Sequence, residues 1–371
     1  MHSEPLSSRD LGWLRLSLTP GLGRKSLRRL YETFGSVEAI LADTAPGRLA
    51  RAGLPARIAT QIPDPAEPRL LQTARRLAAQ GVRLARFWDA DFPPLLAAIP
   101  DPPALLYVRG QWPPPAGLAV VGSRRAGEEG RRLVREICRD LAAAGICIIS
   151  GLARGIDTAA HLGALDAGGA TVAVLGCGID RAYPPENARL FEQIARDGTL
   201  ISEYAPGTPP LAGNFPGRNR IVSGLARGVL VAEAAAGSGS LITADFALEQ
   251  GREVFALPGA PYGPQCSGSN SLLKEGAHLV TEARDILELL WADRPRTPAP
   301  PAPPASRAPL DLSAEALRVL GPLGATALHI DEIVRKSGLT PPEVSAILLH
   351  LELQGCIRQL PGMHYQRLDA R

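Results

Sequence analysis

One segment of the sequence, residues 215–224, combines arginine and amide side chains in a pattern suited to holding an anion. Its polar side chains include Arg218, Asn219 and Arg220. A guanidinium group can hold a phosphate through two parallel hydrogen bonds, and an amide group can add another. We interpret the start of the segment as a basic loop that leads into a helix. The segment therefore predicts one wall of a site for a phosphate-bearing partner.

A second segment suited to an anion follows the buried strand expected at residues 229–233. It is a loop of small residues, and its glycines allow the main chain to approach a ligand closely. The loop consists of Gly237, Ser238, Gly239 and Ser240. We expect a helix from Leu241, because the N–H groups and the dipole of a first helical turn attract anions. The two segments together make a phosphate-bearing partner the first hypothesis.

Two more loops, each expected at the end of a strand, place glycines beside arginines. The candidate binding residues in them are Gly122, Ser123, Arg124, Arg125, Gly151 and Arg154. The first loop lacks a GxGxxG pattern, and no acidic residue stands about 20 positions later to hold a ribose, so dinucleotide binding is disfavoured. An exposed Ser-Arg-Arg turn before a helix suits a phosphate or a stacked base instead. We favour this interpretation over a solvated arginine pair.

Catalytic chemistry finds little support in the sequence. Asp157 and His161 are four positions apart on one helix face, which suits a metal or an acid–base pair, but no third His or Cys stands at a matching spacing. We interpret Asp157 as a residue near a helix N-cap and His161 as a packed or hydrogen-bonded side chain. Glu203 and Glu233 follow strands and are interpreted as polar supports for the loops. We therefore predict no catalytic residue, no metal and no cofactor in a protein that is not an enzyme.

The elements that must position these loops alternate between strand and helix. Short apolar runs rich in β-branched residues predict strands at residues 118–121, 146–149, 171–175, 199–201, 229–232 and 254–257. Helical patterns separate most of them, which requires parallel crossovers and predicts a Rossmann-like, doubly wound, mostly parallel α/β sheet. In such sheets the ligand lies beyond the carboxyl ends of the strands, so the candidate loops are expected to converge on one site.

Composition narrows the class of protein. The chain has 371 residues, of which 45% are hydrophobic and 21% charged, with a formal net charge of only +3. A nucleic-acid partner must therefore be held by a local pocket and not by a long-range field. No apolar run is long enough for a membrane span, and the N-terminus does not resemble a signal peptide. The five cysteines form no CxxC pair, and we expect a cytoplasmic protein.

Changes in composition predict four parts along the chain. We expect a small helical domain at residues 1–75, an extended Rossmann-like DNA-binding domain at 81–292, a Pro/Ala-rich linker at 294–310 and a winged-helix domain at 311–371. In the first part, the Gly-Leu-Gly of Leu18–Arg24 indicates either a hairpin that touches a DNA phosphate or a tight turn between helices. In the last part, the expected recognition helix at 341–353 has no Lys or Arg, so protein contact is favoured over DNA reading.

Read in chain order, these motifs resemble those of the DNA-processing protein A family (DprA, also called Smf). They are GSR at 122–124, SGxAxGIDxxAH at 150–161, LGxGxDxxYPxxN at 175–187, SE at 202–203, FPxRNRI at 215–221 and GSLITA at 239–244. DFPxLL at 91–96 and PxLLYxxG at 103–110 lead into them. The resemblance runs through residues 88–282, and the helical and winged-helix parts fit the family's common layout.

The resemblance implies a bacterial, cytoplasmic protein of natural transformation. Such a protein binds and protects incoming single-stranded DNA, forms a homodimer through its Rossmann-like domain and helps to load RecA for recombination. By matching motif, the family's DNA contacts fall first on Arg124, then on Arg218, Asn219, Arg220 and the loop 237–240. Two departures weaken the local positive field: many relatives have a basic residue where this chain has Gly237, and an arginine where it has Asp245.

Two other classes of function stay open at this point. Nucleotide-processing hydrolases of the phosphoribohydrolase type use Gly-rich loops in similar sheets, but their typical PGGxGTxxE motif does not match residues 258–261, which read Pro-Gly-Ala-Pro. A scaffolding adaptor with a vestigial pocket is the third class. Binding of an oligonucleotide and turnover of a nucleotide distinguish the three.

Overall fold

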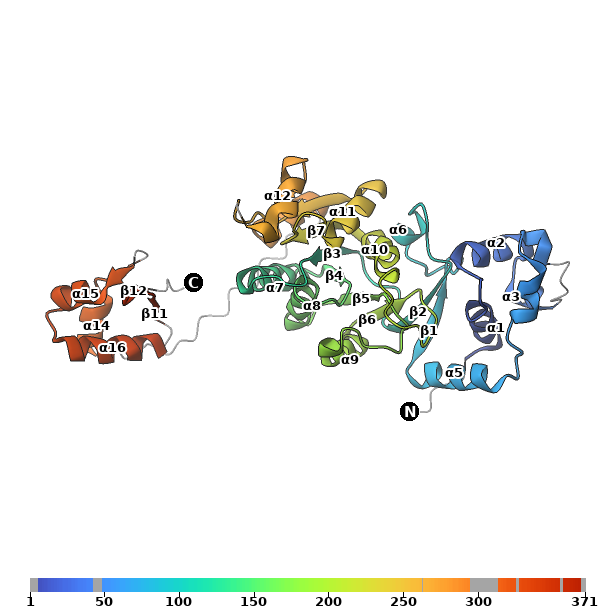
Figure 1. Ribbon diagram of the computed structural model, residues 1–371, viewed down its shortest axis with the longest axis horizontal. Helices are drawn as coiled ribbons and strands as arrows, with labels where there is room; N and C mark the ends of the chain where they lie inside the picture. The colour runs from blue at the N-terminus through green and yellow to red at the C-terminus, as the bar shows by residue number, and fades with distance from the viewer. Residues whose placement is uncertain are drawn as a thin grey trace. The chain divides into compact units, whose positions relative to one another are not determined.

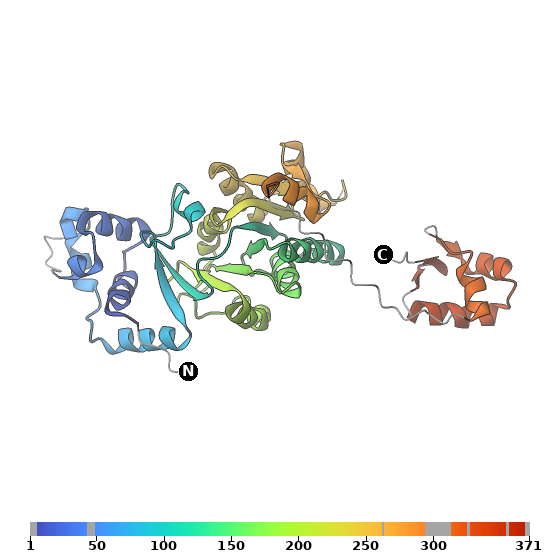
Figure 2. The same ribbon diagram turned by 180° about the vertical axis from the view of Figure 1, so that it is seen from behind.

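The chain divides into two compact units, residues 1–295 and 296–371, each with its own apolar core (Figures 1 and 2). The computed structural model describes residues 6–42, 49–261, 263–293, 313–324, 327–353 and 356–367. The Pro/Ala-rich linker expected at 294–310 lies outside these ranges. No helix in the described ranges is both long and apolar enough to cross a bilayer.

The first unit is built on a nine-stranded sheet in the order β1-β2-β6-β5-β4-β3-β7-β8-β9. The strands are β1 (Val82–Arg86), β2 (Leu105–Gly110), β3 (Gly117–Gly122), β4 (Cys147–Ser150), β5 (Thr171–Leu175), β6 (Thr199–Ser202), β7 (Ala226–Ala232), β8 (Glu253–Ala256) and β9 (His278–Leu279). The pairs from β6 to β9 are parallel, while β1 and β2 are antiparallel additions at one edge. The predicted mostly parallel α/β sheet is confirmed, and the six predicted strands are β3 to β8.

Alternation along the strands explains why helices cover both faces of the sheet. In β3, Ala119 and Val121 face a core that includes α10 and α11, whereas Leu118 and Val120 face a core formed with α7 and α8. The helices of this unit's α/β part are α6 (Pro94–Ala97), α7 (Glu128–Ala143), α8 (Ile156–Asp166), α9 (Ala188–Asp197), α10 (Asn214–Gly224), α11 (Gly239–Glu249), α12 (Ser267–Lys274) and α13 (Ala283–Leu290). Burial on both faces is the reason these strands read as continuous apolar runs.

The N-terminal helices pack onto the same unit. They are α1 (Ser8–Ser17), α2 (Arg24–Phe34), α3 (Val37–Leu41) and α5 (Pro68–Ala79), with short 3-10 turns at Ala50–Ala52 and Ala56–Gln61. Trp13 and Leu30 from these helices share one buried cluster with Tyr107 of β2 and Phe191 of α9. The described residues of this N-terminal part are therefore continuous in packing with the edge of the sheet, and the division at 75 stays a prediction.

Strand order places a crevice at the carboxyl ends of β3 and β7. From β3 the chain continues through α7 to β4 and then outward to β6, after which it returns to β7 on the other side of β3. The connection from β3 therefore leads toward β4 and the connection from β7 leads toward β8, in opposite directions along the sheet. A ligand site is expected at this switch point in open α/β sheets.

The second unit is a small winged helix. Its elements are α14 (Ala314–Leu320), β10 (Leu328–His329), α15 (Ile330–Ser337), α16 (Pro341–Leu353), β11 (Ile357–Leu360) and β12 (His364–Arg367). The strands pair antiparallel in the order β10-β12-β11, and the helices bury a core that includes Val319, Ile333 and Leu348. The predicted helices and wing are confirmed, and the short β10 is an addition to them.

Candidate nucleic-acid interface

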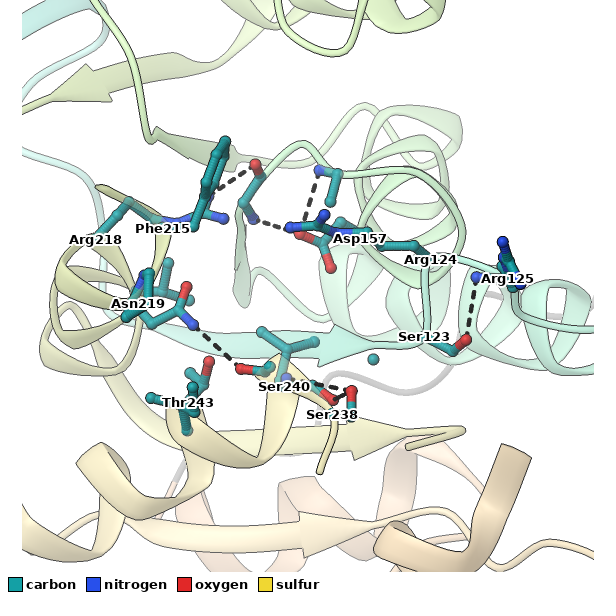
Figure 3. A pocket seen from close by; sticks show the side chains of 18 of the residues that line it. Ser123, Arg124, Arg125, Asp157, Phe215, Arg218, Asn219, Ser238, Ser240 and Thr243 are labelled. Carbon is teal, nitrogen blue, oxygen red and sulfur yellow. Dashed lines mark hydrogen bonds between the residues drawn. The ribbon is translucent and has the colours of Figure 1, made fainter. Parts of the chain in front are cut away.

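A cavity of about 730 Å³ opens at the switch point between β3 and β7 (Figure 3). The predicted residues that line it are Gly122, Ser123, Arg124, Arg125, Gly151, Arg218, Asn219, Ser238, Gly239 and Ser240. They come from the end of β3, from the loops after β3, β4 and β7, and from α10 and the start of α11, which are far apart in the sequence. Convergence at the strand ends thus brings together most of the residues that the sequence singled out.

The expected basic loop at the start of residues 215–224 is wrong, because α10 begins at Asn214 and the arginines lie on the helix. Arg218 is only 5% exposed. Its Nη1 donates to the carbonyl oxygen of Gly151 at 2.7 Å and to that of Val174. Burial lowers the pKa of Arg218, and the nearby Asp157 opposes that change. Arginine still keeps its proton in proteins, so a fixed positive charge lies at the inner wall of the cavity.

Gly151 makes room for this buried guanidinium. A Cβ at position 151 would lie 2.1 Å from Nη1 of Arg218 and 2.4 Å from its Cζ. Gly122, at the end of β3, is equally constrained, since a Cβ there would lie 1.9 Å from the carbonyl oxygen of Ala232 in β7. Both glycines are therefore required by close approach of other groups.

Asp157 and His161 are buried polar residues near Arg218. Asp157 accepts from the backbone N–H groups of Gly151, at 3.1 Å, and Ala153, at 3.3 Å, as expected for a carboxylate near a helix start. Burial raises the pKa of Asp157, while the charge of Arg218 lowers it.

His161 is fully buried and hydrogen-bonded. The hydroxyl of Thr171 donates to the carbonyl oxygen of Ile148 at 2.8 Å, so it must accept from Nδ1 of His161, 2.7 Å away. Burial lowers the pKa of His161 to about 3, which keeps the imidazole neutral. This geometry confirms the interpretation of His161 as a packed, hydrogen-bonded side chain.

The turn after β3 presents Arg124 and Arg125 to solvent at the mouth of the cavity. The hydroxyl of Ser123 accepts from the N–H of Arg125 at 3.0 Å, which fixes the turn. Glu233 holds the same loop from the end of β7: its carbonyl accepts from the N–H of Ser123 at 3.0 Å, and its carboxylate accepts from the N–H of Gly127 at 2.8 Å. The prediction that Glu233 supports a loop is confirmed.

Sequence reasoning missed the aromatic part of the cavity. The ring centroid of Phe215 lies 5.6 Å from Cζ of Arg124 and 5.9 Å from Cζ of Arg218, and the ring of Tyr183 lies 5.8 Å from it. Both aromatic residues line the cavity. A phenylalanine three positions before an arginine on one helix was the available signal, and the helix was not expected there. Aromatic faces beside guanidinium groups are the surface on which nucleic-acid bases stack.

The opposite wall is the N-terminus of α11, which begins at Gly239, two residues before the expected start. Ser238 is the N-cap, and its hydroxyl accepts from the N–H of Ser240. Thr243, only 1% exposed, lines the cavity, and its hydroxyl has no hydrogen-bond partner among the described residues. Asn219 reaches across from α10 and donates to the carbonyl oxygen of Gly239 at 3.3 Å. This wall offers hydroxyl and N–H donors to an anion.

Three predicted residues lie apart from the cavity lining. Arg154 is exposed and forms an ion pair with Glu186. Arg220 is buried on another side of α10 and binds Glu203 at 2.7 Å, which confirms Glu203 as a polar support. Gly237 precedes the lining residues of its loop and has a left-handed φ of 72°. Asp245 is exposed further along α11 and does not line the cavity.

The chain shows similarity to known proteins over both units. A family model described as DNA recombination-mediator protein A matches residues 83–291, and one described as DprA winged helix domain matches residues 299–363. Protein Smf of Escherichia coli is 46% identical over 279 residues, which is 74% of this chain and 75% of that protein. The chain therefore belongs to the DNA recombination-mediator protein A family.

Two solved structures of this kind resemble the fold. DNA processing protein A (DprA) from Streptococcus pneumoniae aligns with a TM-score of 0.64 and 36% identity, covering 77% of this chain and 99% of that chain. A structure that concerns the single-stranded DNA binding mode of DNA processing protein A from Helicobacter pylori aligns with a TM-score of 0.52 and 29% identity, covering 58% and 97%.

Proposed function

We propose that this family member binds single-stranded DNA in the cavity at the carboxyl ends of β3 and β7. The observation that carries the proposal is the arrangement of the Arg124 and Arg218 guanidinium groups around the ring of Phe215. Guanidinium groups neutralise phosphates, and any of the four bases can stack on an aromatic face. A relative that binds single-stranded DNA supports the same assignment.

The geometry favours contacts with the phosphate backbone of the DNA over sequence-specific contacts with its bases. Arg124 and Arg125 stand exposed at the mouth, where they can meet successive phosphates. The α11 N-terminus supplies N–H and hydroxyl donors, which recognise phosphate oxygens and carry no sequence information. Only a single strand can insert its bases into a recess of this kind, so the protein prefers single strands and shows little base preference.

We further propose that the protein acts by binding DNA and a partner protein and does not catalyse a reaction. The protein protects incoming DNA during natural transformation, acts in the cytoplasm as a homodimer and helps RecA to load; family membership supports these points. The carboxylate of Asp157 is engaged by two backbone N–H groups, and the imidazole of His161 is turned to Thr171. Neither side chain is free to activate a water or a nucleophile, which supports binding without chemistry.

The primary test is fluorescence anisotropy with labelled oligo-dT and a blunt duplex of the same length. We expect tighter binding of the single strand, and similar affinities for different single-stranded sequences. Equal or tighter binding of the duplex would contradict the proposal.

Two further assays test the rest of the proposed role. Incubation with a nucleoside monophosphate is expected to give no product, and turnover would indicate a hydrolase of the phosphoribohydrolase type. RecA filament growth on DNA already coated with single-strand-binding protein is expected to accelerate when this chain is added. A monomer at micromolar concentration that does not accelerate growth would point to an adaptor.

A further inference from the structure

A series of ionic contacts links the turn between α1 and α2 (residues 18–24, called the N-terminal hairpin below) to α10, away from the cavity. Arg24, the first residue of α2, lies 2.5 Å from the carboxylate of Asp101 through its Nη2. The same Asp101 oxygen is 3.4 Å from Nε of Arg220, whose Nη2 is 2.7 Å from the carboxylate of Glu203. The loop before β2 and the end of β6 therefore meet at one arginine of α10, and the start of α2 is linked to that arginine through Asp101.

Arg220 is committed to this network and not to the cavity. Its side chain is 4% exposed, and Glu203 beside it is 12% exposed. Nε of Arg220 also donates to the carbonyl oxygen of Asp101 at 2.9 Å, and Nη1 donates to that of Gly217 at 2.8 Å. Arg218 lies two positions earlier on the helix, so the two side chains point to nearly opposite faces. One face of α10 thus presents Arg218 to the cavity while the other is fastened by Arg220.

The hairpin is the part of the N-terminal region that contacts this network. Leu22 and Leu27, on either side of Gly23 and Arg24, are buried in the shared apolar cluster. A cavity of about 180 Å³ remains at the junction, lined in part by Gly23, Arg24 and Glu203. Next to this cavity, Asp101 links the hairpin to α10 through its ionic contacts with Arg24 and Arg220.

A neighbouring contact fixes the start of the same helix. Tyr204, which follows Glu203 at the end of β6, donates its hydroxyl to the carbonyl oxygen of Asn214 at 2.7 Å. Asn214 is the first residue of α10, and its side-chain amide donates to the carbonyl oxygen of Gly176 at 3.1 Å. The helix is therefore held at its first turn and at Arg220, with the cavity residue Arg218 between the two.

We propose that Arg220, Asp101, Glu203 and Arg24 are positioning residues for DNA binding, through which the N-terminal hairpin sets the placement of Arg218 and Asn219. The Gly-Leu-Gly hairpin then serves the DNA site from a distance and does not itself touch a phosphate. Arg220 acts on the ligand through α10 and makes no contact with it. This inference rests on the proposed binding of single-stranded DNA in the cavity.

The decisive variant is Arg24→Ala, tested by anisotropy with labelled oligo-dT at several salt concentrations in the full chain. We expect the affinity to fall by about two- to thirtyfold, the range for substitutions that alter coupling between sites. The slope of log affinity against log salt is expected to stay unchanged, because no phosphate contact is lost. Arg24→Lys retains one charged contact with Asp101 and is expected to recover part of the affinity.

Arg83→Ala is the matched control. Arg83 on β1 forms an ion pair with Asp91 at 2.8 Å, and its side chain is 44% exposed against 39% for Arg24. This pair does not touch α10, so binding is expected to stay at the wild-type level. If Arg24→Ala also binds as the wild type does, the inference is overturned.

Two other outcomes would overturn the inference in distinguishable ways. A salt slope shallower by about one unit in Arg24→Ala would mean that the hairpin contacts a phosphate directly. Failure of the unaltered chain to bind oligo-dT would remove the proposed function itself. If Arg24→Ala is unfolded at the assay temperature, Glu203→Gln decides: it keeps the side-chain size and an acceptor oxygen but removes the charge facing Arg220, and wild-type affinity in that variant would contradict the inference.

Discussion

Two helices, α10 in the first unit and α16 in the second, differ sharply in their suitability for DNA. α10 carries Arg218 and Asn219 into a cavity, whereas α16 has no Lys or Arg and includes Glu343 and Glu352. A winged helix that reads DNA usually places such a helix in the major groove, between two phosphate backbones, where positive charge favours binding. In a chain with a net charge of only +3, this difference supports the proposal that phosphates are bound in the cavity and not by α16.

The two units also differ in how their cations are used. In the winged helix, Arg318, Arg335 and Lys336 lie within 4.0, 3.8 and 2.9 Å of glutamate oxygens in the same unit. In the cavity, Arg218 is held by carbonyl oxygens, which orient the guanidinium and leave its charge in place. These three cations of the winged helix are therefore offset by neighbouring glutamates, whereas Arg218 lies against neutral oxygens with the carboxylate of Asp157 nearby.

The largest effect is expected from Gly151→Ala, which attacks the burial of Arg218. The new Cβ would overlap the guanidinium, which must leave its carbonyl partners. Overpacking of this kind costs about 1–3 kcal/mol of unfolding free energy, and loss of the fixed charge is expected to weaken oligo-dT binding by about tenfold or more. Urea unfolding and anisotropy measure the two effects.

Gly213→Ala is the matched control for this substitution. Gly213 precedes α10, has a φ of −66°, and a Cβ there would meet no atom within 4 Å. Its stability and affinity are expected to remain near wild type. Normal DNA binding by Gly151→Ala would show that the placement of Arg218 does not matter for the ligand.

The next effect is expected from Arg124→Ala at the mouth of the cavity. Because Arg124 is exposed, folding stability should change little, while binding of every oligonucleotide should weaken by a similar factor. The salt slope is expected to become shallower by about one unit, as one phosphate contact is lost. Arg132→Ala, in the exposed pair of Arg132 with Glu136 on α7, is the control. A loss confined to particular sequences would assign Arg124 to base contact.

Much of the fold could be predicted because its strands are buried on both faces. Residues 171–175, for example, form a short β-branched run that reads as a covered strand, and β5 is buried along its whole length. The start of α10 was harder to predict, because Pro216 and Gly217 by themselves indicate a loop. Proline is nonetheless compatible with the first turn of a helix, and tertiary contacts at Asn214 fix that turn.

The candidate site was predictable where its residues follow strands and hidden where it depends on distant pairs. Gly122 and Ser123 could be placed because parallel strands end at one edge. The pairing of Arg220 with Asp101 joins residues 119 positions apart, and the contact of Arg218 with Gly151 joins residues 67 apart. No local pattern distinguishes such a buried arginine from one that faces the ligand.

A smaller effect is expected from the neutral imidazole beneath the cavity. The pKa of His161 is lowered by burial from 6.5 to about 3. Below pH 6.5 the imidazole is therefore protonated in the unfolded chain but stays neutral in the folded chain. Stability is therefore lost as the pH falls through this window, by at most about 1.4 kcal/mol per pH unit. His161→Gln should show a flatter dependence; Asp157 is common to both proteins, so the difference reports the imidazole.

Tryptophan fluorescence is a suitable measurement for this prediction. All four tryptophans, at positions 13, 88, 112 and 291, lie in the cavity-bearing unit. Urea unfolding followed by this signal between pH 7 and 5 therefore reports that unit and not the winged helix. Parallel pH profiles for the wild type and His161→Gln would contradict a buried neutral imidazole.

The smallest effect, and the sharpest test of the comparison, is expected from deletion of residues 295–371. The winged helix has its own core, with Val319, Ile333 and Leu348 fully buried within it, so its removal should leave the first unit folded. Residues 313–371 carry six basic and six acidic side chains, so the truncated protein should bind oligo-dT with unchanged affinity and salt slope. Because no tryptophan is deleted, fluorescence verifies that the remaining unit is folded. A truncated protein with an unaltered unfolding transition but weakened DNA binding would show that the winged helix or the deleted linker arginines 296 and 307 take part. The contrast between α10 and α16 would then no longer locate the DNA site.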